Sequence, residues 1–109
     1  MNWAEYLPLP LTICDAEGTI IYMNPASLES FNKDGGGDLI GSNLLDCHPE
    51  PSKSQLKKML EDQTGHTYSV EKNGKKKLIH EVPWYKDGKF AGLIELSIKI
   101  PEELKEIKK

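Results

Sequence analysis

The sequence predicts an α+β fold, in which a five-stranded antiparallel sheet carries short helices on one face. Two β-rich runs come first, an interrupted helical stretch follows, and three longer β-rich runs come last. Tight-turn residues separate successive runs within each group, which favours antiparallel hairpins over parallel crossovers. At 109 residues the chain has the size of one domain with one core.

Residues 1–7 are expected to form a flanking helix outside that domain. Asn2 can cap a short amphipathic turn, in which Trp3, Tyr6 and Leu7 lie at helical spacing. Little of a small core is left to cover this apolar strip. We therefore expect the chain to form a homodimer through it.

The first two strands are predicted at residues 11–14 and 19–23. The turn Asp15-Ala16-Glu17-Gly18 separates them, and Gly18 supplies the positive φ that a tight turn requires. The two runs therefore predict a hairpin.

The helical middle is predicted to begin at Asn24, a favoured N-cap residue, with Pro25 at the first helical position. A second short helix is expected to start at Asp38. The longest helix is expected over residues 52–62, with Ser52 as its N-cap. Its leucines and its methionine form one apolar face, and its lysines face solvent.

Three further strands are predicted at residues 67–71, 77–85 and 90–98. The pairs Asn73-Gly74 and Asp87-Gly88 lie between them, and both are strong signals for two-residue hairpin turns. The lysines around Asn73-Gly74 are therefore interpreted as a solvated turn rather than as a binding patch.

Composition excludes several classes of protein. The net charge is −3 and no Arg-rich stripe exists, which argues against a nucleic-acid partner. No apolar run approaches the ~20 residues that cross a bilayer, and the first residues lack a secretion signal, so no membrane partner and a cytoplasmic location are expected. Cys14 and Cys47 lack metal-binding spacing and are expected to be buried thiols, with no metal site.

Two segments carry a family resemblance. Asp-Ala-Glu-Gly-Thr-Ile-Ile-Tyr-Met-Asn-Pro-Ala at residues 15–26 precedes Ile-Gly-Ser-Asn-Leu-Leu-Asp-Cys-His-Pro at residues 40–49. In this order and spacing they resemble the PAS sensor domains, and the resemblance covers roughly residues 8–100. It implies the five-stranded sheet with a ligand cavity under the helices. Residues 101–109 then form a charged tail or a short helix.

The resemblance implies a signal-sensing domain that binds a small ligand or a partner protein and transmits a conformational change, by a shift of the helical lid over residues 38–60. An output protein or domain is a further expected partner. No nucleophile elbow, metalloprotease helix or phosphate-binding loop is present, so catalysis is not expected. Asp46, His48 and Glu50 could form an acid–base cluster, but exposed carboxylates at element ends are the favoured interpretation.

The candidate pocket residues are apolar side chains from the strands and helices, together with two residues of the His-Pro segment. They are Ile21, Met23, Phe31, Leu44, Leu45, Cys47, His48, Leu56, Met59, Leu60, Val82, Trp84 and Leu93.

The occupant of such a pocket stays open at this point. His48 is a candidate axial ligand for haem, which would make the domain a gas or redox sensor. Flavin is disfavoured, because Leu44 rather than a reactive Cys follows Gly41-Ser42-Asn43. The third alternative is an interaction and dimerisation module without a ligand, in which His48 only latches a loop.

Overall fold

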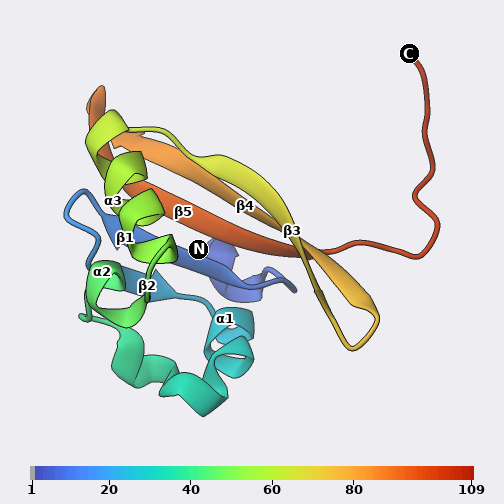
Figure 1. The fold of residues 1–109 in the computed structure, drawn as a ribbon, viewed down its shortest axis with the longest axis horizontal. Coiled ribbons are helices and arrows are strands. Elements are labelled where there is room, and N and C mark those ends of the chain that lie inside the picture. The colour runs from blue at the N-terminus through green and yellow to red at the C-terminus, as the bar shows by residue number, and fades with distance from the viewer. Residues whose placement is uncertain (1) are drawn as a thin grey trace.

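The computed structural model describes residues 2–109, and its centre is a five-stranded sheet in the order β2-β1-β5-β4-β3 (Figure 1). Every neighbouring pair is antiparallel, as predicted. The strands are β1 (Leu11–Asp15), β2 (Ile20–Met23), β3 (His66–Lys72), β4 (Lys75–Lys86) and β5 (Lys89–Lys99).

The helical segments are short, apart from α3 (Ser52–Asp62), and all except the N-terminal one follow β2 as predicted. The α-helices α1 (Pro25–Ser30) and α2 (Leu44–Cys47) precede it, and the 3₁₀ turns are η1 (Trp3–Tyr6), η2 (Asn32–Asp34) and η3 (Gly36–Leu39). Residues 101–109 form neither helix nor strand and extend away from the sheet (Figure 1). No helix in the part of the chain that the structure describes is long and apolar enough to span a membrane.

Both turns predicted from dipeptides form as expected. Asn73 and Gly74 have φ values of 54° and 76°, and Asp87 and Gly88 have 53° and 76°. Two successive left-handed residues define the type I′ turn, whose twist matches that of the flanking strands. These turns fix the registers of β3 with β4 and of β4 with β5.

Asn24 is the fully buried residue that joins the N-terminal turn to the sheet and to α1. Its side-chain oxygen accepts hydrogen bonds from Ser27 N at 2.9 Å and Leu11 N at 3.0 Å. Its Nδ2 donates to Ala4 O at 3.1 Å and Leu9 O at 2.8 Å. The predicted N-cap is confirmed, and the same amide also satisfies backbone groups that the prolines and turns leave without partners.

The expected starts of the other two helices need correction. Ser52 begins α3 but does not cap it, because the N-cap position is Pro51, which has no side-chain acceptor. The Glu50 carboxylate instead accepts hydrogen bonds from Ser54 N at 2.8 Å and Ser54 Oγ at 2.7 Å. The segment at Asp38 is a 3₁₀ turn that begins earlier, at Gly36.

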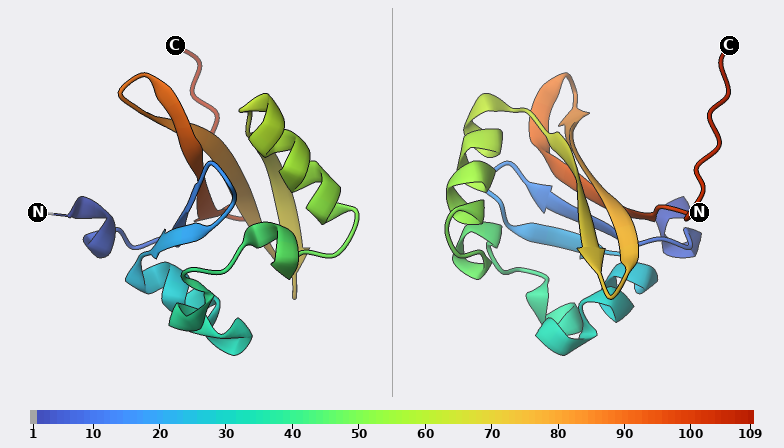
Figure 2. Two further views of the ribbon diagram at one scale, coloured as in Figure 1. Left: turned by 90° about the vertical axis from the view of Figure 1, so that its left-hand side faces the viewer. Right: turned by 45° about the vertical axis from the view of Figure 1, so that its right-hand side comes forward.

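The helices α2 and α3 cover one face of the sheet, called here the inner face (Figure 2). Residues opposite each other in an antiparallel sheet share a face, so the register sorts the strand residues. One row on the inner face, the apolar row, consists of Ile20, Cys14, Leu93 and Pro83. Cys14 and Leu93 pack with Leu56 and Met59 of α3 to form the core.

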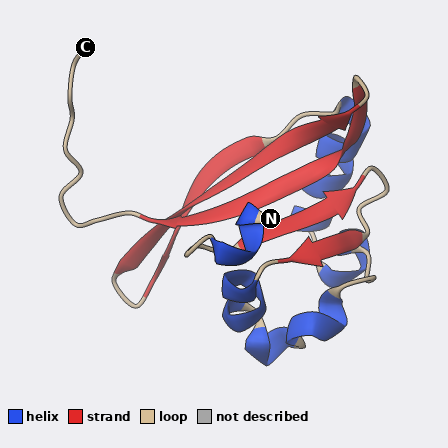
Figure 3. Ribbon diagram, turned by 180° about the vertical axis from the view of Figure 1, so that it is seen from behind, coloured by secondary structure: helices blue, strands red, loops and turns tan. Residues whose placement is uncertain are grey.

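The opposite, outer face carries the N-terminal turn η1 (Figures 2 and 3). Its central row consists of Tyr22, Ile13, Ile94 and Val82. The Tyr22 hydroxyl donates to the Glu5 carboxylate of η1 at 2.5 Å, which ties the turn to β2.

Three predicted pocket residues lie away from the inner face, and for them the expectation is wrong. Ile21 is the extra residue of a bulge between β1 and β2, and it is 46% exposed. Val82 and Trp84 point to the outer face, because side chains alternate along β4 and Glu81 points inward. Trp84 Nε1 donates to Cys14 O at 3.1 Å across β5, at Gly92, whose missing side chain leaves the space.

Candidate sensor cavity

Two connected cavities lie between the inner face and the helical segments. The larger is about 600 Å³ and lies beside the α1 to α2 segment, and the smaller is about 370 Å³ and lies under α3. His48, Tyr68 and Glu95 line both. Volumes of this size are typical of sites for small molecules.

The floor of the cavities is a row of polar side chains, called here the polar row: Thr12, Glu95, Glu81 and His66. It runs beside the apolar row, at a distance of two residues along each of β1, β4 and β5. Glu81 is only 6% exposed, and its carboxylate lies 2.9 Å from His66 Nε2. Among the described residues, nothing donates a hydrogen bond to the Glu95 carboxylate or forms an ion pair with it.

Loss of contact with water raises the proton affinity of both carboxylates, and the adjacent Glu81 adds to this effect at the half-buried Glu95. Burial first, and repulsion from Glu81 second, raises the pKa of Glu95 to about 7. Burial also raises the pKa of Glu81, although the attraction of His66 opposes that rise. Burial and both carboxylates raise the pKa of Tyr68 to about 12, so its phenol stays neutral. The cavities therefore favour positive charge.

His48 follows α2 at the junction of the two cavities. Its Nδ1 lies 2.8 Å from Leu44 O, and because a carbonyl only accepts, Nδ1 carries the proton. In the neutral ring this hydrogen bond leaves the lone pair on Nε2 free. The local geometry of His48 is therefore that of a loop latch that keeps one nitrogen available.

The helix before His48 is held against the first hairpin. Asn43 caps α2 by accepting from Leu45 N at 2.8 Å, and its Nδ2 donates to Glu17 O at 2.9 Å. Leu44 N donates to Gly18 O at 2.9 Å. The position of His48 thus depends on the β1–β2 turn as well as on α2.

The predicted pocket residues fall into three groups. Met23, Phe31, Leu44, Cys47 and His48 line the larger cavity. Leu56, Met59 and His48 line the smaller one. Leu45, Leu60 and Leu93 belong to the core and line neither cavity, while Ile21, Val82 and Trp84 lie outside as described above.

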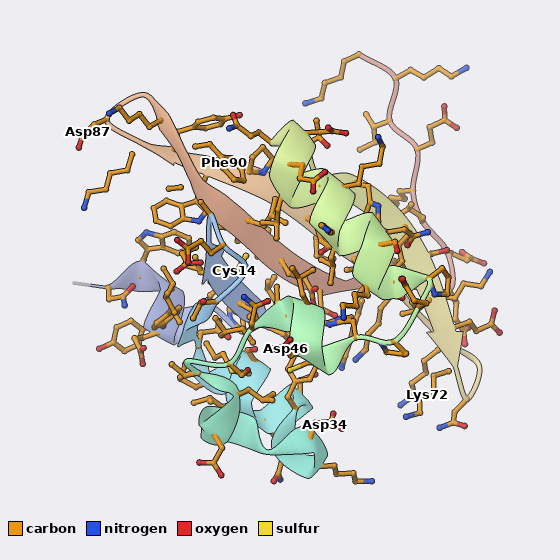
Figure 4. All side chains as sticks on the ribbon, turned by 60° about the vertical axis from the view of Figure 1, so that its left-hand side comes forward. Cys14, Asp34, Asp46, Lys72, Asp87 and Phe90 are labelled. Carbon is orange, nitrogen blue, oxygen red and sulfur yellow. The ribbon has the colours of Figure 1, made fainter. Side chains whose placement is uncertain are left out.

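The candidate acid–base cluster does not form. Glu50 binds Ser54 at the start of α3, and Asp46 is exposed on α2 (Figure 4). Cys14 and Cys47 are free thiols as expected, but only Cys14 is buried. Within residues 2–109 no three side chains of metal-binding type converge on a common point.

Sequence reasoning missed Glu81, Glu95, Tyr68 and the half-buried His66. A signal existed in β5. The run Leu-Ile-Glu-Leu at residues 93–96 contains a single carboxylate, and a period of two places Glu95 on the same face as the core residue Leu93. An acidic residue on a core face indicates a cavity or a buried partner.

Comparisons with known proteins agree with this architecture. The model of the PAS fold family matches residues 4–104. The solved structures similar to this chain include the Aer2 receptor from Vibrio cholerae, described as a dual PAS-heme oxygen sensor (TM-score 0.66, 18% identity, 85% of this chain and 95% of that one). No curated protein sequence matches the chain.

Two other solved structures have similar folds. The PAS domain of BvgS from Bordetella pertussis has a TM-score of 0.65 at 18% identity, over 92% of this chain and 82% of that one. A sensory box sensor histidine kinase from Vibrio cholerae has a TM-score of 0.65 at 17% identity, over 89% and 85%. Because the family model spans nearly the whole chain, the protein belongs to the PAS family, whose members are sensor domains of signalling proteins.

Proposed function

We propose that this PAS domain senses a small molecule bound in the joined cavities and transmits the binding as a conformational change. The observation that carries the proposal is the Glu95 carboxylate, an inward-facing charge without a protein partner. A buried charge lowers stability unless something pairs with it. A ligand that pairs with Glu95 would supply the missing interaction.

The route of transmission follows from the connections of the cavity floor. Glu95 lies on β5, whose last residues lead directly into residues 101–109. The lid residues around His48 contact the β1–β2 hairpin through Asn43 and Leu44. A ligand that shifts this lid would change the relative populations of two packings of the same fold. The function we propose is therefore binding and not catalysis.

The proposal is tested by titrating the full chain with small amines, alcohols and carboxylates while recording its amide NMR spectrum. We expect at least one of these probes to cause saturable shifts at Thr12, Tyr68 and Glu95. Shifts that never saturate, or that scatter over the outer face, would contradict a ligand site in the cavities.

Haem is the second candidate, and the free Nε2 of His48 favours it, because metal-binding histidines commonly donate their other nitrogen to a carbonyl. The rest of the site fits haem poorly. A porphyrin on this floor would cover the carboxylates of Glu81 and Glu95, and no lysine lines either cavity to pair with its propionates. The chain also contains no arginine.

The haem candidate is tested by titrating haemin into the wild-type protein and into the His48→Ala variant. We expect no saturable Soret band in either protein. His48→Ala should instead lower the free energy of unfolding by about 1–2 kcal/mol, because the hydrogen bond to Leu44 O is lost. A Soret band that the wild-type protein shows and the variant lacks would establish His48 as a ligand.

We also propose that the domain forms a homodimer through η1 and the outer face, and that it acts on an output protein or domain in the cytoplasm. Trp3 is 64% exposed and Tyr6 is 75% exposed, although both are aromatic. Ile13, Ile94 and Val82 are only half-buried beside them. If no ligand binds, this surface would support the alternative function of an interaction module.

A further inference from the structure

We infer that the ligand is a small organic cation, a protonated amine with a hydrocarbon body, whose ammonium group binds at Glu95. This inference rests on the proposed function, because it names the class of ligand that the joined cavities would take. Three features of the cavities support it: their charge, the division between polar floor and apolar wall, and the unpaired state of Glu95.

The charges that line the cavities are mostly negative. Asp34, Glu81 and Glu95 supply carboxylates, while His48 and His66 supply imidazoles. None of the 14 basic residues in the sequence, all of them lysines, lines either cavity. A cleft lined by one sign of charge concentrates ligands of the opposite sign. His66 already pairs with Glu81, which leaves Glu95 for the ligand.

The larger cavity separates polar groups from apolar ones. Thr12, Glu95 and His48 lie at the floor and at the junction, whereas the lining side chains from β2 and from residues 31–44 are apolar, apart from Asp34. These apolar residues are Ile20, Met23, Phe31, Leu39 and Leu44. An alkyl or aryl group can bury its surface against them while an ammonium group reaches Glu95.

Ligands of the other two charge types fit less well. An anion would bring a further negative charge next to Glu95 and Glu81 with no lysine nearby to neutralise it. A neutral ligand would desolvate the Glu95 carboxylate without pairing it. A cation both pairs with that carboxylate and screens it from Glu81, its neighbour on β4.

The inference predicts a pH dependence, because the cation requires Glu95 to be ionised and its pKa is raised to about 7. The titratable groups that line the cavities with Glu95 are Glu81 of β4, Tyr68 and His66 of β3, Asp34 of η2, Cys47 of α2 and His48 after it. The helix α3 contributes only uncharged side chains. Protonation of Glu95 removes the charge that pairs with the cation, so cation binding weakens as the pH falls.

The experiment compares n-hexylamine, 1-hexanol and hexanoate, which share one hydrocarbon body and differ in charge, by NMR titration of the full chain. We expect n-hexylamine to bind most tightly. Its affinity should fall about tenfold or more in Glu95→Gln, which keeps the shape of the side chain and removes its charge. Glu103→Gln is the matched control, because it removes one charge from the exposed tail, and it should leave the affinity unchanged.

The same titration at two pH values gives a second test. An alkylammonium group stays protonated throughout, like a lysine with a pKa of about 10.4, so the protein alone changes charge. From about pH 8 to about pH 6 the affinity for n-hexylamine should fall about tenfold, as the ionised fraction of Glu95 falls. Glu95→Gln should reduce this dependence.

The outcomes separate the inference from the proposed function. Tighter binding of hexanoate or 1-hexanol than of n-hexylamine, with saturable shifts at Thr12, Tyr68 and Glu95, would contradict the inference that the ligand is a cation. It would still support a ligand site in the cavities. Binding of n-hexylamine that Glu95→Gln does not weaken would likewise overturn the inference. If none of the three probes, nor any probe of the wider set, binds at the cavity, both fail.

Discussion

The apolar row and the polar row cross the same face of the same strands, two residues apart, and they differ in how they are covered. In the apolar row, Cys14 and Leu93 pack against Leu56 and Met59 of α3. In the polar row, Glu95 and Glu81 face cavities of about 600 and 370 Å³. One half of the inner face therefore stabilises the fold, whereas we expect the other half to lower its stability and to hold the ligand that we propose. Ionisable groups with raised pKa values and no complete set of partners are concentrated at functional sites.

The largest effect is expected in the apolar row. Leu93→Ala should lower the free energy of unfolding by about 2–5 kcal/mol, because it leaves a cavity beside Cys14 and α3. Urea denaturation measures the change. Leu104→Ala, in the exposed tail, is the control and should change stability by less than about 0.5 kcal/mol. A loss below about 1 kcal/mol for Leu93→Ala would mean that Leu93 does not pack in the core under α3.

The second prediction concerns the polar row, where the substitution is expected to raise the free energy of unfolding instead of lowering it. Above about pH 7, Glu95→Gln should raise the free energy of unfolding by about 1–3 kcal/mol, since it removes a half-buried, unpaired charge beside Glu81. The unfolded chain has the lower Glu95 pKa, 4.5, so between that value and about 7 the folded protein binds more protons. The wild-type protein therefore loses stability as the pH rises through this window, relative to the variant.

Urea denaturation of both proteins between about pH 4 and about pH 8 measures this difference. The two curves should approach each other near pH 4.5, the usual pKa of a free glutamate side chain, and separate as the pH rises. A constant difference in unfolding free energy across the range would show that Glu95 keeps an ordinary pKa. A wild-type protein more stable than Glu95→Gln at high pH would show that the Glu95 charge stabilises the fold, which contradicts the prediction.

The third prediction concerns the hydrogen-bonded pair of His66 and Glu81 at the end of the polar row. His66→Ala should destabilise the fold by about 1–3 kcal/mol, because the carboxylate of Glu81 then has no partner in a buried position. The same change in a Glu81→Gln background should have a smaller effect. Unfolding energies of the two single variants and the double variant give the coupling energy. Additive effects would mean that His66 does not stabilise Glu81.

The smallest effect on stability is expected at η1, on the outer face. Trp3→Ala combined with Tyr6→Ala keeps the Asn2 cap and the buried Ala4, so the free energy of unfolding should change by less than about 0.5 kcal/mol. Sedimentation analysis should nevertheless show that this variant dissociates at concentrations at which the wild-type protein is a dimer. A wild-type protein that is a monomer at high concentration would rule out the proposed homodimer.

Much of the fold could be predicted because local residues determine it. The dipeptides Asn73-Gly74 and Asp87-Gly88 require left-handed conformations, which favour two-residue hairpin turns. Asn24 before Pro25 marks a helix start at the level of the sequence alone. In each of these places the side chain or φ preference acts within a few residues, and the prediction holds.

The site was predicted less well, because it depends on the register between strands and on the face of the sheet that each side chain occupies. Hydrophobicity alone predicts Trp84 and Val82 as pocket walls, yet alternation along β4 directs them outward. The bulge at Ile21 displaces the Ile21 side chain, and no pattern in the local sequence predicts this bulge. Glu95 and Glu81 meet only because β4 and β5 pair in one register, and a choice of pocket residues by apolarity could not include them.

The central claim, that the polar row holds a carboxylate in need of a partner, is tested most directly by the carboxyl ¹³C chemical shift of Glu95 as a function of pH. We predict a titration midpoint near 7 in the free protein and a lower midpoint when n-hexylamine is present, because a bound cation stabilises the ionised form. A midpoint near 4.5 that the amine does not move would contradict the claim.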